Sequence, residues 1–342
     1  MKVRLLIFIV LISAIVLLGF FNKNKFNTSK SSQSVINNLT PKNPLEIEAM
    51  RVKSYPGSNL VVEQDLGIVS NYHKYIVSYF SEGLKIYALL TVPTGAKPAG
   101  GWPVIIFNHG YIAPANYQTD PVSGQYATYY PKFSEAGYIV LKPDYRGHGN
   151  SQGQPEGAYY SPAYSTDVLN AIASIKKYSD ANAAKIGMWG HSMGGNITFR
   201  DMVINTKDIK AAVIWGGVVG SYSQLANWRD PFYRPSSYEL SLRYRNRAKL
   251  YEEHGTPQSN PTFWNSLDPT SFLSDIKTPI QLHHGTMDEE VPLDFAKSLN
   301  DKLKAQGKYV EYFEYPGDNH NISGNFNLAM QRSIDFFNKF LK

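Results

Sequence analysis

The sequence of 342 residues contains no cysteine. Disulfide bonds and thiol chemistry are therefore excluded throughout the chain. The sequence also lacks an H-E-x-x-H pattern, and without cysteine pairs it gives little support for a metal site. We expect neither a metal nor a cofactor. The absence of cysteine does not identify a compartment, because many exported proteins lack it too.

Acidic residues are absent from the first 44 positions, although the whole chain carries a net charge of +6. That segment holds six basic residues, which are Lys2, Arg4, Lys23, Lys25, Lys30 and Lys42. The remainder has equal numbers of basic and acidic residues and is neutral. The excess charge therefore indicates the flanks of a membrane segment, and we expect no nucleic-acid partner.

An apolar run of about 17 residues extends from Leu5 to Phe21, close to the lower length limit for a membrane-spanning helix. It lacks an A-x-A-like cleavage site after it and has no lipobox cysteine. We predict an uncleaved signal anchor over residues 1–21, with a cleaved signal peptide as the alternative. Residues 22–44, rich in Asn, Ser, Thr and Lys, are predicted to be a flexible tether. We expect a membrane-anchored protein with an extracytoplasmic catalytic domain, or alternatively a secreted one.

The segment Trp189–Gly195 contains a G-x-S-x-G frame directly after the apolar run Lys185–Trp189. In an α/β-hydrolase this frame is the nucleophile elbow, where a strand turns sharply into a helix and exposes the serine Oγ. Glycines flank the serine because side chains in so tight a turn would collide with the neighbouring strand and helix. The motif predicts Ser192 as a nucleophile. The alternative for the motif taken alone is a glycine-rich turn that has no chemistry.

Two later loops supply an acid and a base in the chain order that this fold requires. The segment Pro279–Gly285 predicts a short buried strand that leads to Asp288, and the alternating run Tyr309–Tyr315 predicts a last strand followed by a turn that presents His320. We therefore expect Asp288 as the acid and His320 as the base. The alternative candidates for the acid are Glu289 and Glu290. The less favoured candidates for the base are His191, His283 and His284. We expect His191 to shape the turn and the other two to pack.

The apolar run Val104–Phe107 predicts a buried strand that ends in Asn108-His109-Gly110-Tyr111. In this fold one oxyanion-binding N–H comes from the loop after this strand, and the other from the residue that follows the nucleophile. We therefore predict an oxyanion hole made by the backbone N–H groups of Tyr111 and Met193. His109 is expected to pack within its loop.

The segment Asp144–Gly149 follows a predicted strand at Tyr138–Leu141. We expect Asp144 and Arg146 to form an ion pair that fixes this loop. Contact with a ligand is the alternative.

Strand and helix patterns alternate from about Leu45 to the end, which favours a mostly parallel sheet with helices on both faces. A hairpin is expected around Gly83. Helices are expected near Tyr126–Glu135, Ser161–Tyr178, Met193–Ile204, Leu293–Gln306 and Asn325–Leu341. The predicted fold is an α/β-hydrolase domain over residues 45–342, with a helical cap inserted at about 220–276. The aromatics of the cap either line the site or form its own core, and they are Trp228, Phe232, Tyr233, Tyr238, Tyr244, Tyr251, Phe263 and Trp264.

Several segments together resemble the catalytic domain of the prolyl oligopeptidase family, in the subgroup that lacks the large N-terminal propeller. The matching segments are Ser78–Lys85, Asn108–Tyr111, Asp144–Gly149, Trp189–Gly195, Asn260–Trp264 with Asp268-Pro269, His284–Pro292 and Gly317–His320. The resemblance implies the same nucleophile, acid and base.

Two departures from the family affect specificity. Where prolyl oligopeptidases carry a tyrosine that assists the oxyanion hole, this chain has Asn108, and the region before Val104 is too short for a propeller. Without that gate, the restriction to short peptides loses its usual basis.

The sequence therefore predicts a serine hydrolase that acts through an acyl-enzyme, as a peptidase cleaving small peptides or as a carboxylesterase cleaving small acyl esters. Its partner would be a short peptide or another small molecule. An acyltransferase and a non-catalytic binding protein are the lesser alternatives. The oligomeric state is not predicted.

Overall fold

The computed structural model describes residues 43–228 and 238–342. The predicted signal anchor, the tether up to residue 42, and two of the cap aromatics, Phe232 and Tyr233, lie outside the described residues. The side chain of Tyr238 lies outside them as well. Within these two ranges, no helix combines the length and hydropathy needed to cross a bilayer.

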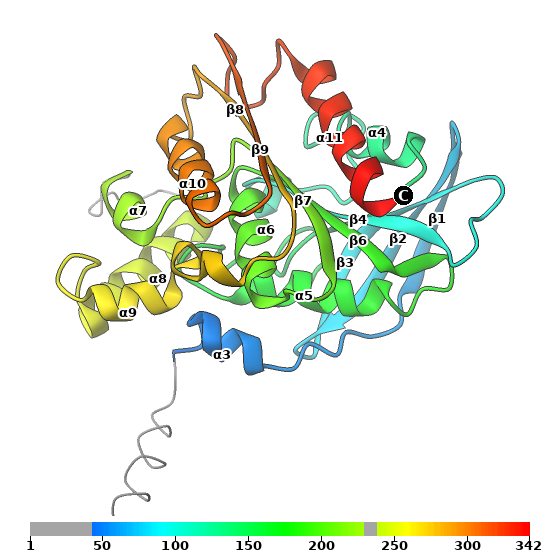
Figure 1. Cartoon of the computed structure of the whole chain (residues 1–342). Helices are drawn as coiled ribbons and strands as arrows, with labels where there is room; N and C mark the ends of the chain where they lie inside the picture. Colours follow the sequence, from blue (N-terminus) through cyan, green and yellow to red (C-terminus); the bar gives the residue numbers. More distant parts are fainter. Residues whose placement is uncertain (1–42, 229–237) are drawn as a thin grey trace, which may run out of the picture. The chain divides into compact units, whose positions relative to one another are not determined.

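One nine-stranded sheet runs through the described chain in the order β1-β2-β3-β5-β4-β6-β7-β8-β9 (Figure 1). The first three strands and the contact of β3 with β5 are antiparallel, and all pairs from β5 through β9 are parallel. The bounds are β1 Val61–Val69, β2 Tyr72–Ser81, β3 Leu84–Pro93, β4 Trp102–Asn108, β5 Ile139–Pro143, β6 Ala181–His191, β7 Ile209–Trp215, β8 Ile280–Gly285 and β9 Val310–Tyr315.

Both faces of the central strands are apolar, because alternate side chains of a strand point to opposite faces. On β4, Val104 and Ile106 join the core on one face, whereas Ile105 and Phe107 join the core on the other. A sheet buried on both sides needs helices on both sides. The sequence of β4 therefore explains why the sheet lies between two helical layers.

Two helical layers cover the sheet (Figure 1). Helices α4 and α11 pack on the face that holds Phe107, and α5, α6 and α10 pack on the face that holds Ile106. The bounds of the helices are α3 Ile47–Val52, α4 Tyr130–Glu135, α5 Ala163–Ile175, α6 Met193–Ile204, α7 Tyr222–Trp228, α8 Tyr238–His254, α9 Pro261–Leu267, α10 Leu293–Ala305 and α11 Phe326–Leu341, and the 3-10 turns are η1 Pro114–Asn116 and η2 Pro269–Asp275. The architecture is that of an α/β-hydrolase, as predicted.

The predicted helices are found, with differences at their ends. Helix α6 has the predicted bounds, and α10 and α11 differ from theirs by one residue. Helix α4 begins four residues later than expected, at Tyr130, because Gln125 and Tyr126 have positive φ angles of 41° and 71°. Left-handed backbone does not continue a right-handed helix.

Helices α7, α8 and α9 and the turn η2 lie between β7 and β8, in the region where the sequence predicts a helical insertion. Trp264 of α9 is buried, and its Nε1–H donates to the carbonyl of Gly255 at 2.9 Å. Tyr222 of α7 and Tyr251 of α8 contact the same indole ring. Some aromatic side chains of the insertion thus pack against one another and form a core within the insertion.

The expected ion pair between Asp144 and Arg146 is absent, and this prediction was wrong. Arg146 instead pairs with Asp167 of α5, with its Nη2 2.8 Å from Oδ1 and its Nε 3.0 Å from Oδ2. The same Nη2 lies 2.9 Å from Glu82, in the turn between β2 and β3. Asp144 is buried and accepts hydrogen bonds from Tyr117, at 2.9 Å, and from Thr119. The loop after β5 is fixed, but by partners distant in sequence.

Candidate active site

The turn after β6 places Ser192 at the start of α6 in a strained conformation. Its φ of 54° and ψ of −119° lie in a region that residues with a side chain rarely adopt. Close packing explains the glycines around it: a Cβ at Gly190 would lie 2.4 Å from the carbonyl oxygen of Gly194, and a Cβ at Gly194 would lie 2.0 Å from that of Asn108. The local geometry is that of the predicted elbow.

The loops after β8 and β9 bring Asp288 and His320 into direct contact. The Nδ1 atom of His320 lies 2.8 Å and 3.0 Å from the two carboxylate oxygens of Asp288. A carboxylate accepts at this position, so Nδ1 carries the proton and Nε2 carries the lone pair. This is the tautomer that a general base requires.

A second imidazole contacts the same carboxylate. The Nε2 atom of His284 lies 3.0 Å from Oδ2 of Asp288 and 3.0 Å from the carbonyl oxygen of Val291. Burial alone would raise the pKa of Asp288, but the hydrogen bonds from His284 and His320 outweigh it and lower that pKa. Asp288 is therefore a carboxylate at neutral pH. We had expected His284 only to pack, and its contact with the acid is an addition from the structure.

His320 contacts His191, the residue directly before Ser192 in the elbow. The Nε2 atom of His191 donates to the backbone carbonyl of His320 at 3.1 Å, and the two rings lie 4.5 Å apart. Among the described residues, however, no hydrogen bond joins Ser192 Oγ to His320. Such bonds are often long in enzymes without substrate and tighten in the complex.

A series of hydrogen bonds connects the loop after β4 to the loop after β9, which carries His320. Because His191 donates through Nε2, its Nδ1 accepts, and the hydroxyl of Tyr126 donates to it at 2.7 Å. That hydroxyl in turn accepts the backbone N–H of Gly110 at 2.8 Å. Burial lowers the pKa of His191 to about 3, so it stays neutral. Nothing in the sequence pattern identified Tyr126, which was expected only to begin a helix.

The two residues of the predicted oxyanion hole come from segments that adjoin the serine. Met193 is the first residue of α6, where an N–H has no partner within the helix. Tyr111 follows Gly110, at which a Cβ would lie 3.1 Å from the Cβ of Ser192. Asn108 is buried, and its Nδ2 donates to Thr198 of α6 at 2.8 Å. Its side chain therefore does not take the part of the missing tyrosine.

The other candidate residues have separate contacts. His283 is buried between Tyr315 and Gln281, at 2.7 Å from each, and the burial lowers its pKa. His109 is buried and stacks on Tyr145. Among the described residues, Glu289 accepts a hydrogen bond from the backbone N–H of His320 alone, at 3.3 Å. Of the three neighbouring acids, Asp288, Glu289 and Glu290, it is Asp288 that the imidazole of His320 contacts.

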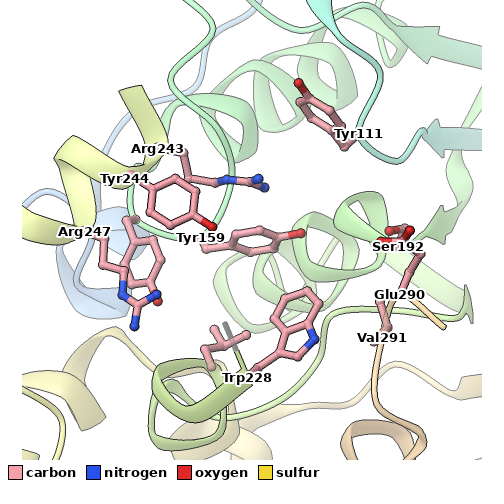
Figure 2. Close-up of a pocket in the computed structure, with 11 residues that line it drawn as sticks. Tyr111, Tyr159, Ser192, Trp228, Arg243, Tyr244, Arg247, Glu290 and Val291 are labelled. Carbon is pink, nitrogen blue, oxygen red and sulfur yellow. The ribbon is translucent and has the colours of Figure 1, made fainter. Parts of the chain in front are cut away.

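A cavity of about 280 Å³ lies over Ser192 (Figure 2). Its walls carry Glu290 and Val291 from the loop after β8, and Tyr111 from the loop after β4. The other lining residues are Tyr159, Tyr160, Leu225, Trp228, Arg243, Tyr244 and Arg247. The cavity brings the nucleophile candidate together with the insertion, which contributes Trp228 and Tyr244 from the predicted aromatic set.

In the described part of the chain, no group of three or more acidic or histidine side chains is arranged to hold a metal ion. The arrangement around Ser192 is suited to acyl transfer, because it combines a candidate nucleophile, a candidate base with an oriented carboxylate, and candidate backbone N–H donors.

Comparisons with known proteins agree with this chemistry. The model of the prolyl oligopeptidase family matches residues 125–342, which is more than half of the chain. Uncharacterized peptidase YtmA of Bacillus subtilis is 23% identical over 76% of this chain and 91% of its own length. Uncharacterized peptidase YuxL of the same organism is 25% identical over 88% of this chain, which spans only 44% of that relative.

Solved structures of similar fold include peptidases and esterases. An acylaminoacyl peptidase in complex with Z-Gly-Gly-Phe-chloromethyl ketone has a TM-score of 0.61 at 20% identity, covering 80% of this chain and 42% of that one. Acetyl xylan esterase from Paenibacillus sp. R4 has a TM-score of 0.60 at 18% identity, covering 84% and 91%. At these identities the likeness concerns the fold.

Proposed function

This chain belongs to the prolyl oligopeptidase family, a family of serine hydrolases, and we propose that it cleaves short peptides through an acyl-enzyme on Ser192. The observation that carries the proposal is the hydrogen-bonded pair of Asp288 and His320, with Nδ1 on the carboxylate at 2.8 Å. This pair leaves the lone pair of Nε2 available beside the elbow.

In the proposed mechanism, His320 takes the proton of Ser192 as Oγ attacks the carbonyl carbon. Asp288 holds the imidazole in the required tautomer and stabilises the imidazolium that forms. The N–H groups of Tyr111 and Met193 stabilise the oxyanion, and one such donor typically contributes about 3 kcal/mol in the transition state. His320 then protonates the leaving group, and water, activated by the same base, releases the acyl group.

Hydrolysis of small acyl esters is the second candidate. The cavity of about 280 Å³ is at the small end of ligand sites. Acetyl xylan esterase from Paenibacillus sp. R4 has a similar fold. Since the triad and the oxyanion hole do not distinguish an ester from an amide, the shape of the cavity and protonation of the leaving group decide between them.

Labelling with a fluorophosphonate probe tests the nucleophile. We expect the purified chain to be labelled and Ser192→Ala to be unlabelled and inactive. Ser323→Ala provides a matched control, because this exposed serine follows His320 by three residues. Hydrolytic activity that survives in full in Ser192→Ala would exclude the mechanism. Absence of labelling in the native chain would favour a non-catalytic binding protein.

A paired substrate panel separates the two substrate classes. It consists of acyl 4-nitrophenyl esters of graded chain length and peptide anilides of one to three residues. We expect measurable kcat/KM for peptide anilides. Turnover of esters alone would assign the chain as a carboxylesterase, and transfer to an added alcohol in preference to water would identify an acyltransferase.

We also propose that residues 1–21 anchor the protein in a membrane, with the catalytic domain outside the cytoplasm. The apolar run after Lys2 and Arg4 supports this proposal. The test compares fractionation of the full chain with that of a chain that begins at Leu45. We expect the full chain in the membrane pellet after alkaline extraction and accessible to added protease. Release into the medium with a new N-terminus would instead identify a cleaved signal peptide.

A further inference from the structure

Helix α8 directs two arginines into the cavity over Ser192. Arg243 and Arg247 are four residues apart, so they lie on the same face of the helix, and both line the cavity. Arg247 is buried, donates to the carbonyl of Ala226 at 3.2 Å, and lies over the rings of Tyr160 and Tyr251. Its position is accounted for by packing within the insertion.

Arg243 is held differently. Its guanidinium carbon lies 5.6 Å from the ring centre of Tyr111 and 5.4 Å from that of Tyr159. Figure 2 shows the guanidinium in the space between these two rings. Within the described ranges, Arg243 has neither a carboxylate partner nor a hydrogen-bond acceptor. Its contacts there are with ring faces, which orient the planar group and leave its N–H edge available.

Arg243 and Arg247 bring two positive charges to one wall of the cavity. Like charges at i and i+4 on a helix repel each other, and a concave site strengthens the field of the charges that line it. The acidic residue lining the cavity, Glu290, comes from the loop after β8. In Figure 2, it lies with Val291 on the side of Ser192, across the cavity from Arg243. An anionic ligand would satisfy the free N–H edge.

We propose that Arg243 is a specificity-determining residue that binds a carboxylate of the substrate. This inference rests on the proposed function of Ser192. One guanidinium edge offers two parallel N–H groups, which match the two oxygens of a carboxylate. Tyr111, which contacts Arg243, also follows Gly110, a loop glycine that packs against Ser192. The substrate carboxylate therefore lies close to the scissile carbonyl, as in the acyl group of a dicarboxylic acid or at the C-terminus of a short peptide.

Two pairs of matched substrates distinguish these sources of the carboxylate. On the acyl side, the 4-nitrophenyl half-ester of glutarate is compared with its methyl ester. On the leaving-group side, trialanine is compared with trialanine amide. For the full chain in mild detergent, we expect the carboxylate form of at least one pair to have a kcat/KM higher by roughly tenfold or more, since hydrogen bonds to charged groups are strong.

Variants assign the preference to this side chain. Arg243→Met should abolish the preference, because it lowers kcat/KM of the carboxylate member far more than that of the neutral member. Arg243→Lys should restore only part of it, because an ammonium group lacks the planar fork. Arg245→Met is the control, because Arg245 is exposed on the same helix and does not line the cavity. It should keep the full preference.

The outcomes separate this inference from the proposed function. A labelled, active enzyme with no carboxylate preference in either pair would overturn the role of Arg243, and so would a preference that persists in Arg243→Met. An enzyme that is neither labelled nor active would overturn the proposed function of Ser192, and the inference would fall with it.

Discussion

The two walls of the cavity are built by different means. On one wall, Ser192 and Tyr111 lie in loops at the carboxyl ends of parallel strands, and hydrogen bonds through Tyr126 and His191 join those loops. The other wall consists of Trp228, Arg243 and neighbouring side chains on helices of the insertion. The first wall is fixed by backbone geometry and buried polar contacts, whereas the second depends on ring packing.

This difference assigns separate tasks to the two walls. Strand ends hold reacting groups precisely, because their positions follow from the register of the sheet. Side chains on an inserted helix can change size and charge without moving those groups. We therefore expect changes in the first wall to affect the rate of the chemical step, and changes in the second to affect the choice of substrate.

The largest expected effect follows from Asp288→Asn in the strand-end wall. An amide would donate to Nδ1 of His320 and move the lone pair away from Nε2, so kcat should fall by roughly 10⁴-fold. The measurement is steady-state kinetics on the best substrate of the panel. Glu289→Gln is the control, because Glu289 accepts only a backbone N–H of His320. If Glu289→Gln were the more damaging change, the assignment of the acid would be wrong.

The next effect concerns the anchor of the loop after β5. Arg146→Met would leave the fully buried carboxylate of Asp167 without its ion partner, and the free energy of unfolding should fall by about 3 to 5 kcal/mol. Urea denaturation at neutral pH measures this change. The exposed pair of Lys132 and Glu135 gives the control, since Lys132→Met should cost less than about 1 kcal/mol. A loss of activity with unchanged stability would instead indicate that Arg146 contacts the ligand.

A smaller effect is expected where hydrogen bonds connect the loops of the first wall. Tyr126→Phe removes the acceptor of the Gly110 N–H and the donor to His191, and kcat should fall by roughly ten- to a hundredfold. KM should change little if the loss concerns positioning. Tyr129→Phe is the matched control, because its hydroxyl makes only a long bond of 3.4 Å to Asn321. Equal effects of the two substitutions would argue against a connected chain.

The smallest effect belongs to the insertion. Trp228→Leu should change the ratio of kcat/KM between long and short acyl esters by less than about tenfold, with the rate of fluorophosphonate labelling almost unchanged. Phe263→Leu is the control, since Phe263 stacks on His254 and does not line the cavity. If Trp228→Leu reduced labelling as strongly as Tyr126→Phe, the division of tasks between the walls would fail.

The strand-end wall was largely predictable from the sequence, because its signals are local. The glycines around Ser192, the apolar runs before each loop and the positions of Asp288 and His320 all lie within a few residues of the feature that they predict. The bounds of α6 follow from the same local pattern. The catalytic roles of these residues remain predictions until the variants are measured.

The remaining features depend on contacts between distant residues. Asp167 is 21 residues from Arg146, and Tyr126 is 65 residues from His191, so no local pattern connects them. Strand β1 escaped prediction because it lies at the sheet edge, has irregular register and is exposed along much of its length. The cavity-facing position of Arg243 required the placement of α8, which apolar periodicity does not give.

The backbone at Ser192 has a consequence for the evolution of such enzymes. A positive φ costs a residue with a side chain on the order of 1 kcal/mol, and glycine avoids most of that cost. Selection for stability alone would therefore favour glycine at position 192, at the cost of the nucleophile that we propose. A lineage that no longer needed that proposed nucleophile would have a one-residue route to a more stable protein.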